Sequence, residues 1–303
     1  MKRFWIPILT ALLVMLTGCG ASSKTEPQFS VACTTYPVYL LANSIAGDLD
    51  GVAVTLVINQ QVSCLHDYSL TISDMKALEA ADVVAINGAE LEDFLEDALE
   101  GRTTIDCSAD MILLEADGEA DEDQEAHHHH HEDGDPHIWM DPLRYARMAC
   151  NLAEALAEAD PAHGEIYLSR GEDCAAELER FYGEMTENYS DLQGVEIITF
   201  HDGFAYFADA FGMEIAAAIE EEEGAEVSAK ALKETIEIVQ EQRLPAVFTE
   251  VNGSNNAART IQQECGVEVA ALSMIMSGQD GDTIAAYEAA QRQNLQTILE
   301  AYQ

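Results

Sequence analysis

Residues 160–192, DPAHGEIYLSRGEDCAAELERFYGEMTENYSDL, lie near the middle of the chain and carry a long helical pattern. The Asp160–Pro161 pair is typical of an N-cap followed by proline at the first helical position, and the pattern continues to about Leu192. Its apolar side chains keep helical spacing at Ile166, Leu168, Leu178, Phe181 and Tyr182. A helix of this length predicts a bridge between two separate units.

The sequence on either side of this helix alternates short apolar strands with helical segments. Strand patterns lie at 29–35, 52–58, 83–87 and 103–107 before it, and at 195–200, 213–219, 246–249 and 267–272 after it. Such alternation predicts βαβ units with parallel sheets. We therefore expect an α/β protein with an N-terminal lobe over residues 29–141, a helical linker over 142–192 and a C-terminal lobe over 193–303.

The composition limits the kinds of partner. The chain has 303 residues, enough for one large domain or two of ordinary size, and its 48% of hydrophobic residues indicates a globular protein. With 14 Lys and Arg against 56 Asp and Glu, the formal net charge is -42. A charge of this sign argues against nucleic acid and against an anionic membrane surface as the partner of the folded body.

The first residues have the pattern of an export signal. Lys2 and Arg3 precede an apolar segment, 4–16, that is too short for a comfortable membrane span. The segment ends in LTGC at 16–19, which resembles a bacterial lipobox. We predict a signal peptide over 1–18, lipidation of Cys19, a tether over 19–28 and an extracytoplasmic protein anchored to the bacterial cell membrane. The alternative is an ordinary cleaved signal that ends near a cysteine by chance.

A histidine run is the most conspicuous feature of the sequence. It lies within 115–135, an acidic stretch without periodic hydrophobicity that we expect to be a mobile loop. A purification tag would be terminal, and this run is internal. Flexible imidazoles among acids should bind zinc weakly, because ordering a long loop costs entropy. We therefore predict an accessory metal-binding loop, made of His127, His128, His129, His130 and His131.

Three other histidines have a different setting. His66 follows a strand and loop, His137 comes just before a helix, and His201 ends a strand. Ligands of open α/β sheets bind beyond the carboxyl ends of the strands, and zinc favours imidazole nitrogens. Each histidine alone is more often a structural residue, and His163, at the start of a helix, is interpreted as one. The acids next to the three, Asp67, Asp141 and Asp202, are candidates to hold the second ring nitrogens.

Several short motifs occur in a shared order along the chain. They are TTYPV at 34–38, HDY at 66–68 with SD at 73–74, DPHIW at 135–139 with DP at 141–142, and FHDGFAYF at 200–207. Together they resemble the zinc- and manganese-binding solute proteins of ABC transporters, the ZnuA-like or cluster A-I group. The resemblance covers nearly all of the chain after residue 34. It implies two α/β lobes joined by a rigid helix, with a metal site in the cleft between them.

The resemblance also implies a ligand set. His66 and His137 would come from the first lobe and His201 from the second. Manganese-type members carry an aspartate ligand after the last strand, where this chain has Ser273. Three imidazoles without that carboxylate suit Zn²⁺ over Mn²⁺. Glu250 is a possible fourth ligand, water is another, and Cys64 is interpreted as a structural thiol.

These observations predict a monomeric zinc receptor that passes Zn²⁺ to the membrane permease and ATPase of an ABC importer and catalyses no reaction. One alternative keeps the fold and changes the cargo to manganese or iron, or makes the protein chiefly an adhesin. The other is a zinc-dependent hydrolase, with three histidines, a bound water and Glu250 as general base. The chain contains no HExxH motif of the kind that many zinc hydrolases use.

Overall fold

The computed structural model describes residues 27–59, 68–115, 134–219, 227–251, 253 and 255–303. Several predicted functional residues lie outside these ranges. They are the lipidation site Cys19, the ligand His66 with its neighbours Cys64 and Asp67, and the histidine run His127–His131.

The N-terminal lobe contains a parallel sheet of four strands in the order β2-β1-β3-β4. The strands are β1 (Phe29–Cys33), β2 (Val52–Leu56), β3 (Val83–Ile86) and β4 (Thr104–Asp106). Helices α1 (Tyr36–Ala46) and α2 (Ile72–Ala80) follow β1 and β2, as expected for βαβ units. Between β3 and β4 the chain forms a 3₁₀ turn, Asp93–Leu95, followed by the short α3 (Glu96–Leu99).

The C-terminal lobe repeats this topology. Its parallel strands have the order β6-β5-β7-β8. They are β5 (Glu196–Thr199), β6 (Glu214–Ala218), β7 (Ala246–Glu250) and β8 (Glu268–Leu272), with α6 (Ala205–Phe211), α7 (Ala229–Gln242) and α8 (Asn256–Cys265) between them. In both lobes the strand order reverses at the first strand, so the carboxyl ends of β1 with β3, and of β5 with β7, are the expected ligand-binding edges.

The predicted linker is a pair of antiparallel helices, α4 (Pro142–Ala159) and α5 (Gly164–Asn188), followed by a 3₁₀ turn at Ser190–Leu192. The prediction that Asp160 is the N-cap of this helix, with Pro161 as its first residue, is wrong, because α5 begins at Gly164. Asp160 ends α4, and its carboxylate accepts a hydrogen bond from Tyr167 Oη (2.9 Å) and lies 2.6 Å from His163 Nδ1. These contacts fold residues 160–163 into a turn, which delays the start of α5.

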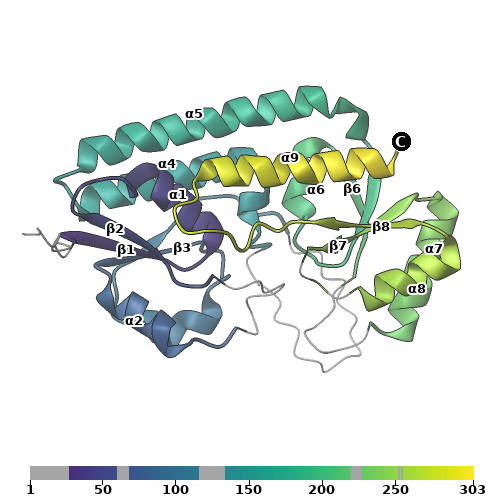
Figure 1. Ribbon diagram of the computed structural model, residues 1–303, viewed down its shortest axis with the longest axis horizontal. Coiled ribbons are helices and arrows are strands. Elements are labelled where there is room, and N and C mark those ends of the chain that lie inside the picture. The colour runs from purple at the N-terminus through teal and green to yellow at the C-terminus, as the bar shows by residue number, and fades with distance from the viewer. Residues whose placement is uncertain (1–26, 60–67, 116–133, 220–226, 252, 254) are drawn as a thin grey trace, which may run out of the picture.

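The two lobes are joined by more than α5. Figure 1 shows α5 and the final helix α9 (Ile284–Ala301) lying along the same side of both lobes. Between β8 and α9, the chain returns to the N-terminal lobe, where Tyr36 Oη donates to Asp282 (2.6 Å) and Tyr39 Oη to Asp280 (3.1 Å). One apolar core includes residues of both sheets and of α4, α5 and α9. No helix among the described residues is both long and apolar enough to cross a membrane.

Candidate metal centre

His137 lies on a tightly held turn before the 3₁₀ segment Ile138–Met140. The carboxylate of Asp135 accepts a hydrogen bond from the backbone N–H of His137 (2.8 Å) and lies 2.7 Å from its ring Nδ1. Asn87, just after β3, donates from its side-chain amide to the carbonyl of Pro136 (3.0 Å). Trp139 is fully buried. The ring of His137 is therefore fixed by the carboxyl edge of the first sheet.

His201 comes from the other lobe, two residues after β5. Its Nδ1 lies 3.4 Å from Oε1 of Glu250, which is the last residue of β7. Strands β5 and β7 are neighbours, so this pair stands at the reversal point of the second sheet. Burial raises the pKa of Glu250 to about 8, although His137 lowers it.

The two imidazoles face each other through their remaining nitrogens. His137 Nε2 and His201 Nε2 are 3.3 Å apart, and the ring planes are nearly perpendicular. Two nitrogens at about 2.0–2.1 Å from a tetrahedral Zn²⁺ lie about 3.3–3.4 Å from each other. The observed separation therefore fits two ligands of one zinc ion, with each Nδ1 next to a carboxylate.

The electrostatics of this centre are acidic. Burial lowers the pKa of His137, but Asp135, Asp202 and Glu250 outweigh it and leave the pKa raised. The same negative groups that stabilise a protonated imidazole also favour a divalent cation. The neighbouring Asp141 has another task, because its carboxylate accepts from the backbone of Leu143 (2.7 Å) and caps α4.

The assignment of carboxylates to rings is a correction to the sequence prediction. Asp141 was expected to hold an imidazole, but its carboxylate is used at the helix N-terminus and by Arg144 Nε (3.2 Å). Asp135 holds His137 instead. The DPH spacing could have indicated this, since an Asp two residues before a residue readily accepts that residue's backbone N–H, as in an Asx-turn.

Ser273 directly follows β8, as the resemblance implied. Its Oγ accepts a hydrogen bond from the backbone of Ile275 (3.1 Å), and its own N–H donates to Asn294 Oδ1 (2.8 Å). Within the described residues, no set of three or more His, Cys, Asp or Glu side chains is arranged to hold a metal ion. The third predicted ligand, His66, is not among those residues.

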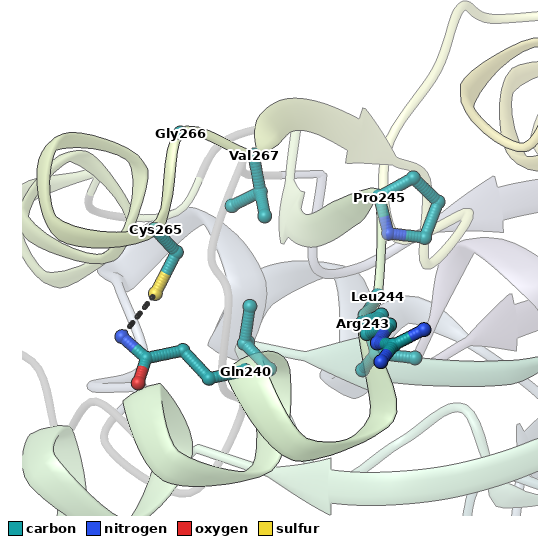
Figure 2. Close-up of a pocket in the computed structure, with 8 residues that line it drawn as sticks. Gln240, Arg243, Leu244, Pro245, Cys265, Gly266 and Val267 are labelled. Carbon is teal, nitrogen blue, oxygen red and sulfur yellow. Dashed lines mark hydrogen bonds between the residues drawn. The ribbon is translucent and has the colours of Figure 1, made fainter.

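A pocket of about 510 Å³ lies elsewhere on the C-terminal lobe (Figure 2). It is lined by residues that precede β7 and β8, including Arg243, Pro245 and Val267, and Cys265 Sγ lies 3.9 Å from Gln240 Nε2. These residues are at the amino ends of the strands, whereas His201 and Glu250 are at the carboxyl ends. The pocket is therefore separate from the imidazole pair.

Two α/β lobes that bring imidazoles together from the carboxyl ends of their sheets define a two-lobed metal-binding protein. Over residues 31–301 the sequence matches the family described as zinc-uptake complex component A, periplasmic (ZnuA). The chain belongs to this family of metal-binding, extracytoplasmic solute-binding proteins, whose members are not enzymes.

Individual relatives agree with this assignment. The zinc-binding lipoprotein AdcA of Streptococcus pneumoniae is 25% identical over 307 residues, with 98% of this chain and 60% of the relative aligned. The manganese-binding lipoprotein MntA of Halalkalibacterium halodurans is 24% identical over 271 residues, covering 87% of this chain and 86% of the relative. This chain thus spans about 60% of the length of AdcA.

A crystal structure of ZnuA superposes with a TM-score of 0.75 at 26% identity, covering 91% of this chain and 99% of that one. The predicted fold class, two α/β lobes with parallel sheets, is confirmed.

Proposed function

We propose that this protein captures Zn²⁺ between its two lobes through His66, His137 and His201 and delivers it to an ABC-type importer. The observation that carries the proposal is the pair of Nε2 atoms 3.3 Å apart, which come from different lobes and match the spacing of two ligands on one zinc ion. His66 enters from its sequence motif.

Asp135 and Glu250 have supporting roles in this proposal. Each carboxylate lies beside an Nδ1, and so fixes its ring with Nε2 turned toward the ion. Glu250 was a possible fourth ligand in the sequence. Since it faces the far side of the His201 ring from the Nε2 pair, we assign it to holding that ring and leave the fourth position to water.

The choice of zinc follows from the ligand types. Imidazole suits zinc, whereas manganese prefers carboxylate and water oxygens. Relatives named for either metal are similar to this chain, so the family alone does not decide. The hydroxyl of Ser273 is engaged by Ile275, which supports a site without an oxygen ligand from that position.

The rest of the proposal comes from the sequence and the family. The run His127–His131 binds zinc weakly, and Cys19 carries the lipid that keeps the monomeric protein at the membrane. The partners are a permease and an ATPase, in keeping with a family described as a component of a zinc-uptake complex.

Calorimetric titration of metal-free protein with Zn²⁺ tests the ligand set. Replacing His66, His137 or His201 by Ala should each abolish the tight site. His163→Ala is a matched control, since His163 also lies beside a carboxylate but on the turn between α4 and α5. Unchanged zinc affinity in His137→Ala or His201→Ala would overturn the site, and tighter Mn²⁺ than Zn²⁺ binding by the unmodified protein would overturn the cargo.

A further inference from the structure

Gly203 lies against both imidazoles. A Cβ atom at this position would be 2.7 Å from His201 Cδ2, 3.1 Å from His137 Cδ2 and 2.5 Å from Met274 Cε. The backbone of Gly203 is not among those with positive φ, so its conformation does not require glycine. Glycine is required at this position because a side chain would have no room. The two imidazole rings and the terminal methyl of Met274 fill the space that it would need.

Met274 is directed to this place by the turn that follows β8. Its carbonyl accepts a hydrogen bond from the Trp139 indole (2.9 Å). The side-chain amide of Asn294 accepts from the backbone N–H of the preceding Ser273 (2.8 Å) and donates to the Ser273 carbonyl (2.9 Å). The next residue, Ile275, has φ +61°, a left-handed conformation that a β-branched side chain rarely adopts. A strained backbone persists where its surroundings hold it, often at functional sites.

The position of the methyl group matters chemically. The Met274 methyl and the Cδ2 atom of each ring all lie within 3.1 Å of the position that a Cβ on Gly203 would take. In each imidazole Cδ2 is bonded to Nε2, so the methyl group lies on the Nε2 side of the imidazole pair. Met274 is buried, with 5% of its surface exposed. A methyl group cannot ligate an ion and does not hydrogen-bond a water molecule, so this side of the centre is closed to both.

We propose that Met274, in the room left by Gly203, is a specificity-determining residue that restricts the bound ion to a low coordination number. The proposal rests on the function proposed above and deepens it. Zinc is satisfied by four tetrahedral ligands, whereas Mn²⁺ and Mg²⁺ prefer about six oxygen-rich ones. An apolar group beside the two imidazoles should therefore reduce zinc affinity little. It should weaken the binding of Mn²⁺ and Mg²⁺, because it removes a position that their larger coordination shells would fill.

Cobalt provides a direct readout, because four-coordinate Co²⁺ absorbs strongly in the visible range and six-coordinate Co²⁺ weakly. The unmodified protein loaded with Co²⁺ should give the strong bands. Met274→Ala removes this apolar group, so its bands should weaken, and its Zn²⁺-to-Mn²⁺ affinity ratio should fall about tenfold or more, in the range of other changes around a metal site. Met274→Leu keeps an apolar group and should retain both properties.

The variant Gly203→Ala tests the same contact from the other side. Its Cβ would displace the rings and the methyl group, so zinc affinity should fall about 10–100-fold. Thermal unfolding of all three variants checks that they fold.

A strong four-coordinate spectrum and an unchanged affinity ratio in Met274→Ala would overturn the proposal. So would weak bands in Met274→Leu, which would indicate that the sulfur atom is a ligand. These outcomes are distinct from failure of the proposed function, in which the unmodified protein itself would lack a tight site for one Zn²⁺.

Discussion

Replacing Glu250 by Gln should stabilise the metal-free protein. The Glu250 side chain is 6% exposed. Its Oε1 lies 3.4 Å from His201 Nδ1 but makes no hydrogen bond of normal geometry among the described residues. Burial raises its pKa from the ordinary 4.5 to about 8. Glutamine has nearly the same shape and still offers an oxygen to His201 Nδ1, but it carries no charge to bury.

The size of the effect follows from linkage between protonation and folding. Because the pKa is higher in the folded protein, folding above about pH 4.5 requires Glu250 either to keep a proton that the unfolded chain has lost or to bury a charge. The cost is absent below about pH 4, grows as the pH rises from 4.5 to about 8, and is constant above that. At pH 7 the difference of about 2.5 pH units, at about 1.4 kcal/mol each, gives about 3 kcal/mol.

Urea unfolding of metal-free protein between pH 5 and pH 8 measures this difference. The advantage of Glu250→Gln should increase from about 1 kcal/mol at pH 5 to about 3 kcal/mol at pH 7. Glu241→Gln, at an exposed position of α7, is the matched control and should change the free energy of unfolding little at either pH.

With zinc bound, the advantage of Glu250→Gln should shrink, because the ion favours a carboxylate beside its ligand, and zinc affinity should be about 10–100-fold weaker than in the unmodified protein. An advantage that is absent at pH 7, or that does not grow with pH, would show that Glu250 is ionised and paired in the folded state, contrary to this reasoning.

Three further predictions concern other parts of the chain. Zinc binding should release protons and weaken on acidification, because the raised pKa of His137 keeps its imidazole protonated to higher pH. Calorimetry in buffers of different ionisation enthalpy measures the proton release. A zinc affinity that does not change with pH would indicate that other ligands dominate. Deleting residues 127–131 should lower the zinc stoichiometry and spare one tight site, measured by titration; loss of that site would refute the accessory role. Gly171→Ala should destabilise the protein by about 1–3 kcal/mol, since its Cβ would lie 2.3 Å from Ala153 Cβ. Gly183→Ala, in the same helix, is the control and should not destabilise the protein, because no atom lies within 4 Å of its Cβ position. Equal urea midpoints for the two variants would contradict the tight packing of α4 against α5.

The fold was predictable from local patterns, because the spacing of apolar residues within each strand and helix reflects which of its faces is buried. Alternating strands and helices indicated both parallel sheets, and α4 begins at Pro142, where the predicted helical linker begins. The start of α5 was not predictable in this way. The carboxylate of Asp160 serves either as an N-cap or in a contact with Tyr167, and only the packed structure decides between them.

The site was predictable in part, for a similar reason. His137 and His201 were candidates because each lies next to a strand end or a helix start, and the structure brings them together. The side of the ring that Glu250 occupies depends on the pairing of β5 with β7. Gly203 and Met274 gave no signal, because a glycine and an apolar side chain acquire their importance only from the space between two lobes.

Hydrogen bonds between the two lobes support the separation of the two imidazoles. Several hydrogen bonds connect the N-terminal lobe to the C-terminal segment. Three of them are Trp139 to the Met274 carbonyl, Gln291 of α9 to the Met140 carbonyl (2.9 Å), and Tyr36 to Asp282. Two of them start or end within three residues of His137, and separating the lobes there would expose the fully buried Trp139. A site already held at zinc spacing needs little reorganisation on binding, so more of the metal–ligand free energy is retained as affinity. A ligand such as His137, which the fold already holds in place, binds without the entropy cost of ordering a segment first.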